Sequence, residues 1–107
     1  MDPVSCLVAQ IRHADRRFKK ASHQVTLLNN KIASTRCRYD RACRDSRKMF
    51  ARKRSLQLTT YEGVRHMYFE YAAQRCEEIQ QLCDTLWEVA GLEYDDVVED
   101  DSREVKL

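Results

Sequence analysis

The sequence predicts an all-α protein: a two-helix antiparallel coiled-coil hairpin with a long first helix, a shorter second helix and a disordered acidic C-terminal tail. Only two glycines and one proline occur among the 107 residues, so the chain lacks the turn formers that a β-sandwich, a barrel or a phosphate-binding loop needs. Apolar residues recur in steps of three and four, and acidic residues gather at the end. We expect a basic heptad-patterned helix over residues 3–57, an acidic amphipathic helix over 58–91 and an acidic tail over 92–107.

The first helix has a clear start and a long apolar seam. Asp2 is a suitable N-cap, and Pro3 occupies the first helical position, where its missing N–H loses no hydrogen bond. A 3.5-residue repeat of this length is typical of a helix that supercoils with another helix. The seam positions, the first nine of which are all apolar, are Val4, Leu7, Ile11, Ala14, Phe18, Ala21, Val25, Leu28, Ile32, Thr35, Tyr39, Ala42, Ser46 and Met49.

The boundary between the two helices is predicted near residue 58. Thr59, followed three residues later by Glu62, forms a capping-box pattern, and Gly91 suits the position just past the end of a helix. One unbroken helix over residues 3–90 is the alternative, because no residue between 54 and 60 forces a turn. The expected apolar face of the second helix consists of Val64, Tyr68, Tyr71, Ala72, Cys76, Ile79, Leu82, Cys83, Leu86, Val89 and Ala90.

The net charge of +2 conceals a strong polarity along the chain. Residues 1–57 carry 15 Lys and Arg against 4 Asp and Glu, whereas residues 58–92 carry 2 against 6 and residues 93–107 carry 2 against 7. Folding the chain near residue 58 would place Glu62 near Arg54 and Asp84 near Lys31. A parallel pairing of two first helices yields no attractive flanking pair, so the charges favour the hairpin.

A second helix that ends near residue 90 would reach back only to about residue 26 of the first helix. The seam over residues 4–25 would then have no cover within the chain, and an apolar stripe of that length is expected to bind something. Its partner would be a second copy or a helix of another protein. The alternative is that the hairpin has its turn elsewhere. The candidate partner-binding residues are Val4, Leu7, Ile11, Phe18, Val25 and Leu28.

A dense basic stretch covers residues 36–54, with nine Lys and Arg against two Asp. Such a density suits an acidic protein surface, for example that of a cytoskeletal filament, or the phosphates of a nucleic acid. Nucleic acid is the weaker interpretation, because the charges ring the helix and only Tyr39 and Phe50 are at hand for base stacking. The candidate contact residues are Arg38, Arg41, Arg44, Arg47, Lys48, Arg52, Lys53 and Arg54.

The remaining signals are weaker. Ser55 follows three basic residues and resembles a kinase site, where a phosphate would add negative charge beside the expected turn. The five cysteines form no C-x-x-C pair, which is typical of a reduced, intracellular protein. No Cys–His or carboxylate–His pair is set by spacing, so we predict no catalytic residue, metal or cofactor.

The sequence therefore predicts a non-enzymatic coiled-coil adaptor or structural subunit of an intracellular protein assembly. It would bind partner helices through the seam and acidic surfaces through the basic stretch, in the cytoplasm, with cytoskeletal and nuclear placement both open. A nuclear nucleic-acid-associated protein that uses residues 36–54 is one alternative, and a microtubule- or axoneme-decorating protein is another. No apolar run approaches the ~18–20 residues needed to span a bilayer, so no membrane partner is expected.

Overall fold

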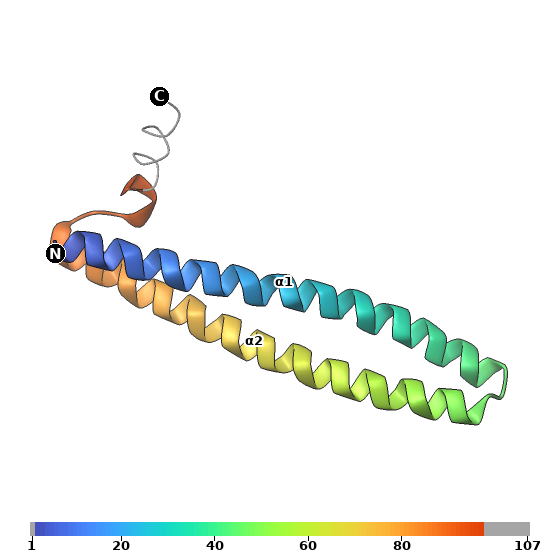
Figure 1. The fold of residues 1–107 in the computed structure, drawn as a ribbon. Coiled ribbons are helices and arrows are strands. Elements are labelled where there is room, and N and C mark those ends of the chain that lie inside the picture. Colours follow the sequence, from blue (N-terminus) through green and yellow to red (C-terminus); the bar gives the residue numbers. More distant parts are fainter. Residues whose placement is uncertain (1, 98–107) are drawn as a thin grey trace. The chain divides into compact units, whose positions relative to one another are not determined.

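The computed structural model describes residues 2–97, which form two long helices, α1 (Pro3–Arg44, 42 residues) and α2 (Lys48–Ala90, 43 residues), joined at residues 45–47 (Figure 1). The predicted all-α helical hairpin is confirmed. The chain divides into two compact units. We call Lys19–Ala72 the turn unit, and Met1–Phe18 with Ala73–Leu107 the terminal unit. Within each unit, a segment of α1 packs against a segment of α2.

The start of α1 is as predicted. The Oδ1 atom of Asp2 accepts a hydrogen bond of 3.2 Å from the backbone N–H of Val4, which satisfies one of the helix's free donors. The seam also follows the predicted register along the whole of α1, because its positions from Val4 to Ala42 are all buried or half-buried. The heptad pattern thus identified most of the packed face of α1, but it missed the buried Val8. The predicted seam positions Ser46 and Met49, which lie beyond α1, are exposed.

The turn lies earlier than predicted, at residues 45–47 and not near residue 58. Ser46 has a left-handed backbone with φ of 58°. Its N–H donates to the carbonyl of Cys43 at 3.2 Å, and the N–H of Arg47 donates to the carbonyl of Ala42 at 2.9 Å. These two bonds make a Schellman motif, which normally has glycine where Ser46 stands. The two helices are consequently of nearly equal length, where a long first and a shorter second helix were expected.

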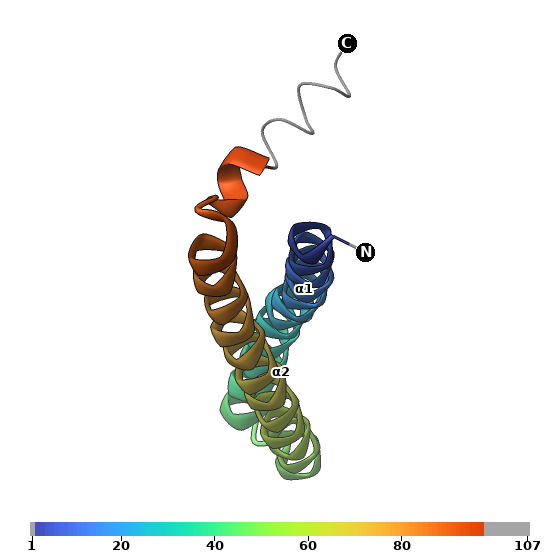
Figure 2. The ribbon, with the colours of Figure 1, turned by 90° about the vertical axis from the view of Figure 1, so that its left-hand side faces the viewer.

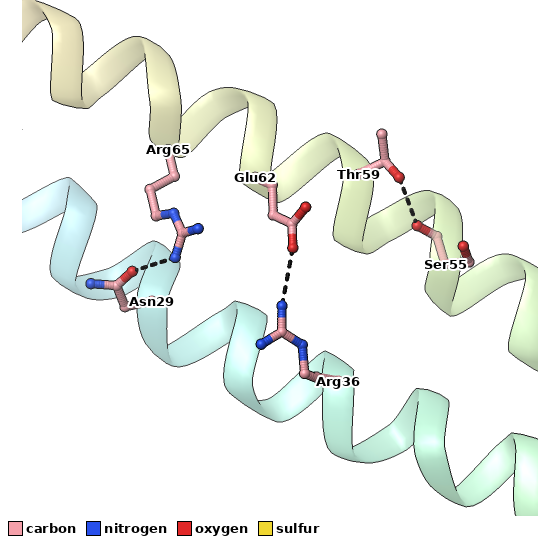
Figure 3. A network of polar contacts seen from close by, with 6 residues as sticks. All are labelled: Asn29, Arg36, Ser55, Thr59, Glu62 and Arg65. Carbon is pink, nitrogen blue, oxygen red and sulfur yellow. Dashed lines mark hydrogen bonds and ion pairs between the residues drawn. The ribbon is translucent and has the colours of Figure 1, made fainter.

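The predicted capping box lies inside α2 and caps nothing. The hydroxyl of Thr59 donates to the carbonyl of Ser55, one turn earlier, at 3.1 Å (Figure 3). The carboxylate of Glu62 reaches across to α1 and accepts from Arg36 at 3.1 Å, and not from Arg54 as a turn near 58 required. A Ser/Thr–x–x–Glu pattern can serve a helix interior equally well, because a threonine hydroxyl bonds to the carbonyl four residues before it.

The packed face of α2 differs from the predicted one in both halves of the helix, and the predicted Val89 and Ala90 are exposed. Val64 and Cys76 are exposed, whereas Arg65 and Arg75 are half-buried. Arginine can pack its aliphatic stem in a seam while its guanidinium reaches a polar partner. A prediction based on apolar residues alone therefore misses such a position. The seam positions of α2 are Ala51, Arg54, Leu58, Tyr61, Arg65, Tyr68, Ala72, Arg75, Ile79, Leu82 and Leu86.

The apolar core of the terminal unit is small and tightly closed. Ile11 and Leu86 are both 0% exposed and form one cluster with Val8. Leu86 comes from α2 and the other two from α1, so this cluster holds the helices of the unit together by burial of apolar surface. The partly buried residues packed against it are Val4, Leu7, Ile79, Leu82, Cys83, Tyr94 and Val97.

The segment after α2 belongs to the same core. Gly91 ends the helix as predicted, with φ of 65° and an N–H that donates to the carbonyl of Trp87 at 2.8 Å. Residues 94–97 form one further helical turn, seen beyond the end of α2 in Figure 2, and Tyr94 packs on the core. The predicted acidic tail over 92–107 thus begins with packed residues, and its part from residue 98 lies outside the described residues.

Candidate basic binding surface at the turn

The early turn folds the basic stretch back on itself. Arg38, Arg41 and Arg44 lie in the last two turns of α1, Arg47 lies in the connection, and four more basic residues lie in the first two turns of α2. All eight residues predicted for electrostatic contact therefore lie within two helical turns of the connection. We call them the basic turn surface: Arg38, Arg41, Arg44, Arg47, Lys48, Arg52, Lys53 and Arg54.

A cavity of about 200 Å³ opens within this surface. Four guanidinium groups and the Phe50 ring line it, and Asp45 supplies its only carboxylate. The guanidinium of Arg47 stands over the Phe50 ring, 5.8 Å from the ring centroid, which holds both side chains beside the opening. The four arginines are Arg38, Arg41, Arg47 and Arg54.

The helix dipoles act differently on the two sides of the turn. Arg41 and Arg44 lie in the last turn of α1, where a positive charge is stabilised by the helix C-terminus. The first turn of α2 contains no acidic residue, and Lys48 opens it. Positive side chains at a helix N-terminus repel the partial positive charge of that end. The start of α2 is thus a place where an external anion would relieve repulsion.

Few of these charges are compensated by the rest of the described chain. Arg54 donates to the amide oxygen of Gln57 at 2.8 Å, which is a neutral acceptor. Across residues 2–97, no ion pair forms to any member of the basic turn surface, while the neighbouring Arg36 is paired with Glu62. The exposed members, which exclude the half-buried Arg54, can meet a partner's carboxylates without first breaking an internal pair.

Aromatic side chains at this surface are scarce. Tyr39 is half-buried in the seam, and Phe50 is occupied by Arg47. Sequence-tolerant binding of single-stranded nucleic acid depends on rings on which bases stack, so the arrangement favours carboxylates over bases. The sequence analysis named Phe50 only for base stacking; its place in the cavity wall depends on where the turn falls.

The predicted partner-binding seam is covered within the chain. Because the turn lies at 45–47, α2 extends far enough to pair with α1 from its first turn, and the expectation that residues 4–25 lack cover is wrong. Ile11 is fully buried and Leu7 packs on the same core in the terminal unit. Val4 and Phe18 are half-buried, and Val25 and Leu28 are buried in the turn unit.

Ser55 is exposed on α2. Its backbone carbonyl accepts the Thr59 hydroxyl (Figure 3), and the residue lies inside a continuous helix and not beside the turn. A phosphate there would face solvent close to the basic turn surface. Whether the residue is modified stays a prediction.

The described residues hold no group of three His, Cys, Asp or Glu side chains that could bind a metal ion. Neither helix within these residues has the length and apolar character that crossing a membrane requires. Comparison with family models, curated proteins and solved structures gave no match.

Proposed function

We propose that this protein is a non-enzymatic helical adaptor that binds an acidic protein surface through the basic turn surface. The observation that carries the proposal is the folding of the Arg-rich stretch around residues 45–47, which gathers eight basic side chains without internal ion pairs among the described residues. The terminal unit would act as the structural anchor that keeps the two helices joined while the turn contacts the partner.

Long-range attraction is the expected mode of recognition. The turn unit carries thirteen Lys and Arg against four Asp and Glu, and a field of this sign raises the encounter rate with acidic partners. Binding should weaken with salt, since exposed charges are screened over about 8 Å at physiological ionic strength. The predicted heptad seam has no part in this proposal, because α2 occupies it.

The test uses microtubules as an acidic protein surface and measures co-sedimentation of the full chain. Arg47→Gln with Arg52→Gln removes two charges from the basic turn surface. Arg16→Gln with Lys20→Gln removes two exposed charges from α1 elsewhere and is the matched control. We expect the first variant to bind several-fold more weakly and the control to bind as the wild type does. Equal weakening of both variants would contradict the proposal.

A nucleic-acid partner is the alternative outcome. Fluorescence anisotropy with a mixed-sequence DNA duplex, at the same salt concentration, separates the two. Binding to the duplex that is tighter than binding to microtubules, with log K falling linearly against log salt, would favour the alternative of a nuclear nucleic-acid-associated protein.

A further inference from the structure

The outward side of α2 in the turn unit carries apolar side chains that nothing in the described chain covers. Leu56 is 63% exposed and Met67 is 68% exposed, although both are large hydrophobic residues. Single exposed apolar residues are common on proteins. These two belong to a regular pattern, which we call the outer face: Lys53, Leu56, Thr60, Gly63, Met67 and Glu70, all exposed.

The outer face has the spacing of a second coiled-coil seam. Its positions alternate in steps of three and four, as the packed seam of the same helix does, and they fall on the opposite side of the helix. A helix with one such seam packs against one neighbouring helix. Only Leu56 and Met67 among these positions are large apolar residues, and they are the surface that a second helical neighbour would cover.

Gly63 has no explanation inside the chain. It lies within α2, where glycine is less favourable than alanine by about 1 kcal/mol. A Cβ atom added there would meet nothing within 4 Å, so no internal contact requires its absence. A small residue in the middle of an exposed seam instead lets another helix approach closely.

We propose that the outer face is a homodimer interface, on which α2 of a second copy packs antiparallel. In the register centred between Tyr61 and Glu62, Leu56 faces Met67 of the second copy and Thr60 faces its Gly63. Lys53 faces Glu70 of the second copy at each end. The two-fold axis makes every pair occur twice, as an isologous contact requires.

Charge selects this orientation. In the antiparallel register, the outermost pairs are opposite in charge, whereas a parallel pair would place Lys53 against Lys53 and Glu70 against Glu70. The flanking positions agree, because Phe50 would face Tyr71 and Gln57 would face Val64, with no like charges. Glu70 is held by His66 one turn earlier at 3.0 Å, in a surface pair that leaves its carboxylate accessible to a lysine.

The test is the absolute mass of the full chain in solution, measured by light scattering under reducing conditions at about 50 µM. We expect a dimer. Leu56→Glu places a charge against Met67 twice per dimer, and it should raise the dissociation constant at least about a hundredfold. Leu27→Glu alters an exposed leucine of α1, away from the outer face, and should leave the dimer intact. Circular dichroism establishes that both variants keep their helices.

The register has its own test. Lys53→Glu and Glu70→Lys should each weaken the dimer by creating like-charge pairs, and the double variant should restore it. A monomeric wild type, or a dimer that Leu56→Glu leaves unchanged, would overturn the interface, and a double variant weaker than both single ones would overturn the antiparallel register. Leu56 lies outside the basic turn surface, so Leu56→Glu tests this proposal separately from the proposed function. Lys53 belongs to both surfaces, so its variants report on both.

Discussion

The terminal unit and the turn unit use the same two helices but differ in what fills the seam between them. In the terminal unit, Ile11 and Leu86 are completely buried among aliphatic neighbours. In the turn unit, Arg65 stands at a seam position of α2 and donates to the Oδ1 atom of Asn29 at 2.9 Å, as Figure 3 shows. Both units bury apolar side chains, such as Leu28 and Ile32 in the turn unit, but the turn unit adds polar pairs across its seam.

Charge separates the units in the same way. The described residues of the terminal unit carry four Lys and Arg against nine Asp and Glu, whereas the turn unit has a large basic excess. Acidic side chains also line a cavity of about 550 Å³ beside Ile11, Trp87 and Tyr94 in the terminal unit. Under the proposed function, the turn unit contacts the partner and the terminal unit stabilises the fold. A substitution in one unit should then have little effect on the role of the other.

The largest effect on stability is expected at Leu86. We expect Leu86→Ala to lower the free energy of unfolding by about 2–5 kcal/mol, because it opens a cavity in a fully buried cluster. Urea unfolding followed by circular dichroism measures the loss. Leu27→Ala, at an exposed position, should change the free energy by no more than about 0.5 kcal/mol. Similar losses for both variants would mean that the terminal core does not dominate stability.

A smaller change, an increase in the free energy of unfolding, is expected when Arg65 is replaced. Arg65→Leu exchanges one hydrogen bond with an exposed asparagine for apolar burial in the seam, and should raise the free energy of unfolding by about 1 kcal/mol. Arg16→Leu, on an exposed position of α1, should give no such gain. The same urea titration compares them. A loss of stability in Arg65→Leu would show that its bond to Asn29 holds the turn unit together.

The smallest expected effect concerns the Cys83 thiol of the terminal unit. Burial raises the pKa of the Cys83 thiol, and the nearby Asp95 and Asp84 raise it further. Since the thiolate is the reactive form, the raised pKa should move the alkylation of Cys83 to higher pH. Mass spectrometry of iodoacetamide-treated protein over a pH series tests this. Asp95→Asn should shift the Cys83 profile back toward lower pH.

The same raised pKa links Cys83 to stability. The folded state favours the protonated thiol, so its contribution is complete below the pKa of the unfolded chain and is lost as the pH rises through the folded-state value. The effect is confined to alkaline solution.

The prediction from sequence succeeded where periodicity alone determines structure. The seam of α1 and the ends at Asp2 and Gly91 follow from spacing and from capping chemistry. It failed at the turn, because Ser46 takes the left-handed position that glycine usually marks, and because the Thr59–Glu62 pattern imitates a helix start. The eight basic residues were identified in advance, but their gathering at one turn depends on that missed connection.

The second helix shows the other limit. Arg65 and Arg75 occupy seam positions through their stems and polar partners, with Arg75 bonded to Glu78 at 3.1 Å. A prediction that considers apolar residues alone assigns the packed positions to adjacent residues instead, such as Val64 and Cys76. Only the position of the facing helix reveals which side chains are packed.

The three-residue turn has a consequence for how quickly the chain can fold. Ile11 and Leu86 are 75 positions apart, so a chain that closed this contact first would lose the entropy of a long loop. A chain that begins at Ser46 closes only short loops at each step, and the helices can then pair progressively outward from the turn. The polar pairs between Asn29 and Arg65 and between Arg36 and Glu62 lie on that route. On this route, the polar pairs of the turn unit would form before Ile11 meets Leu86.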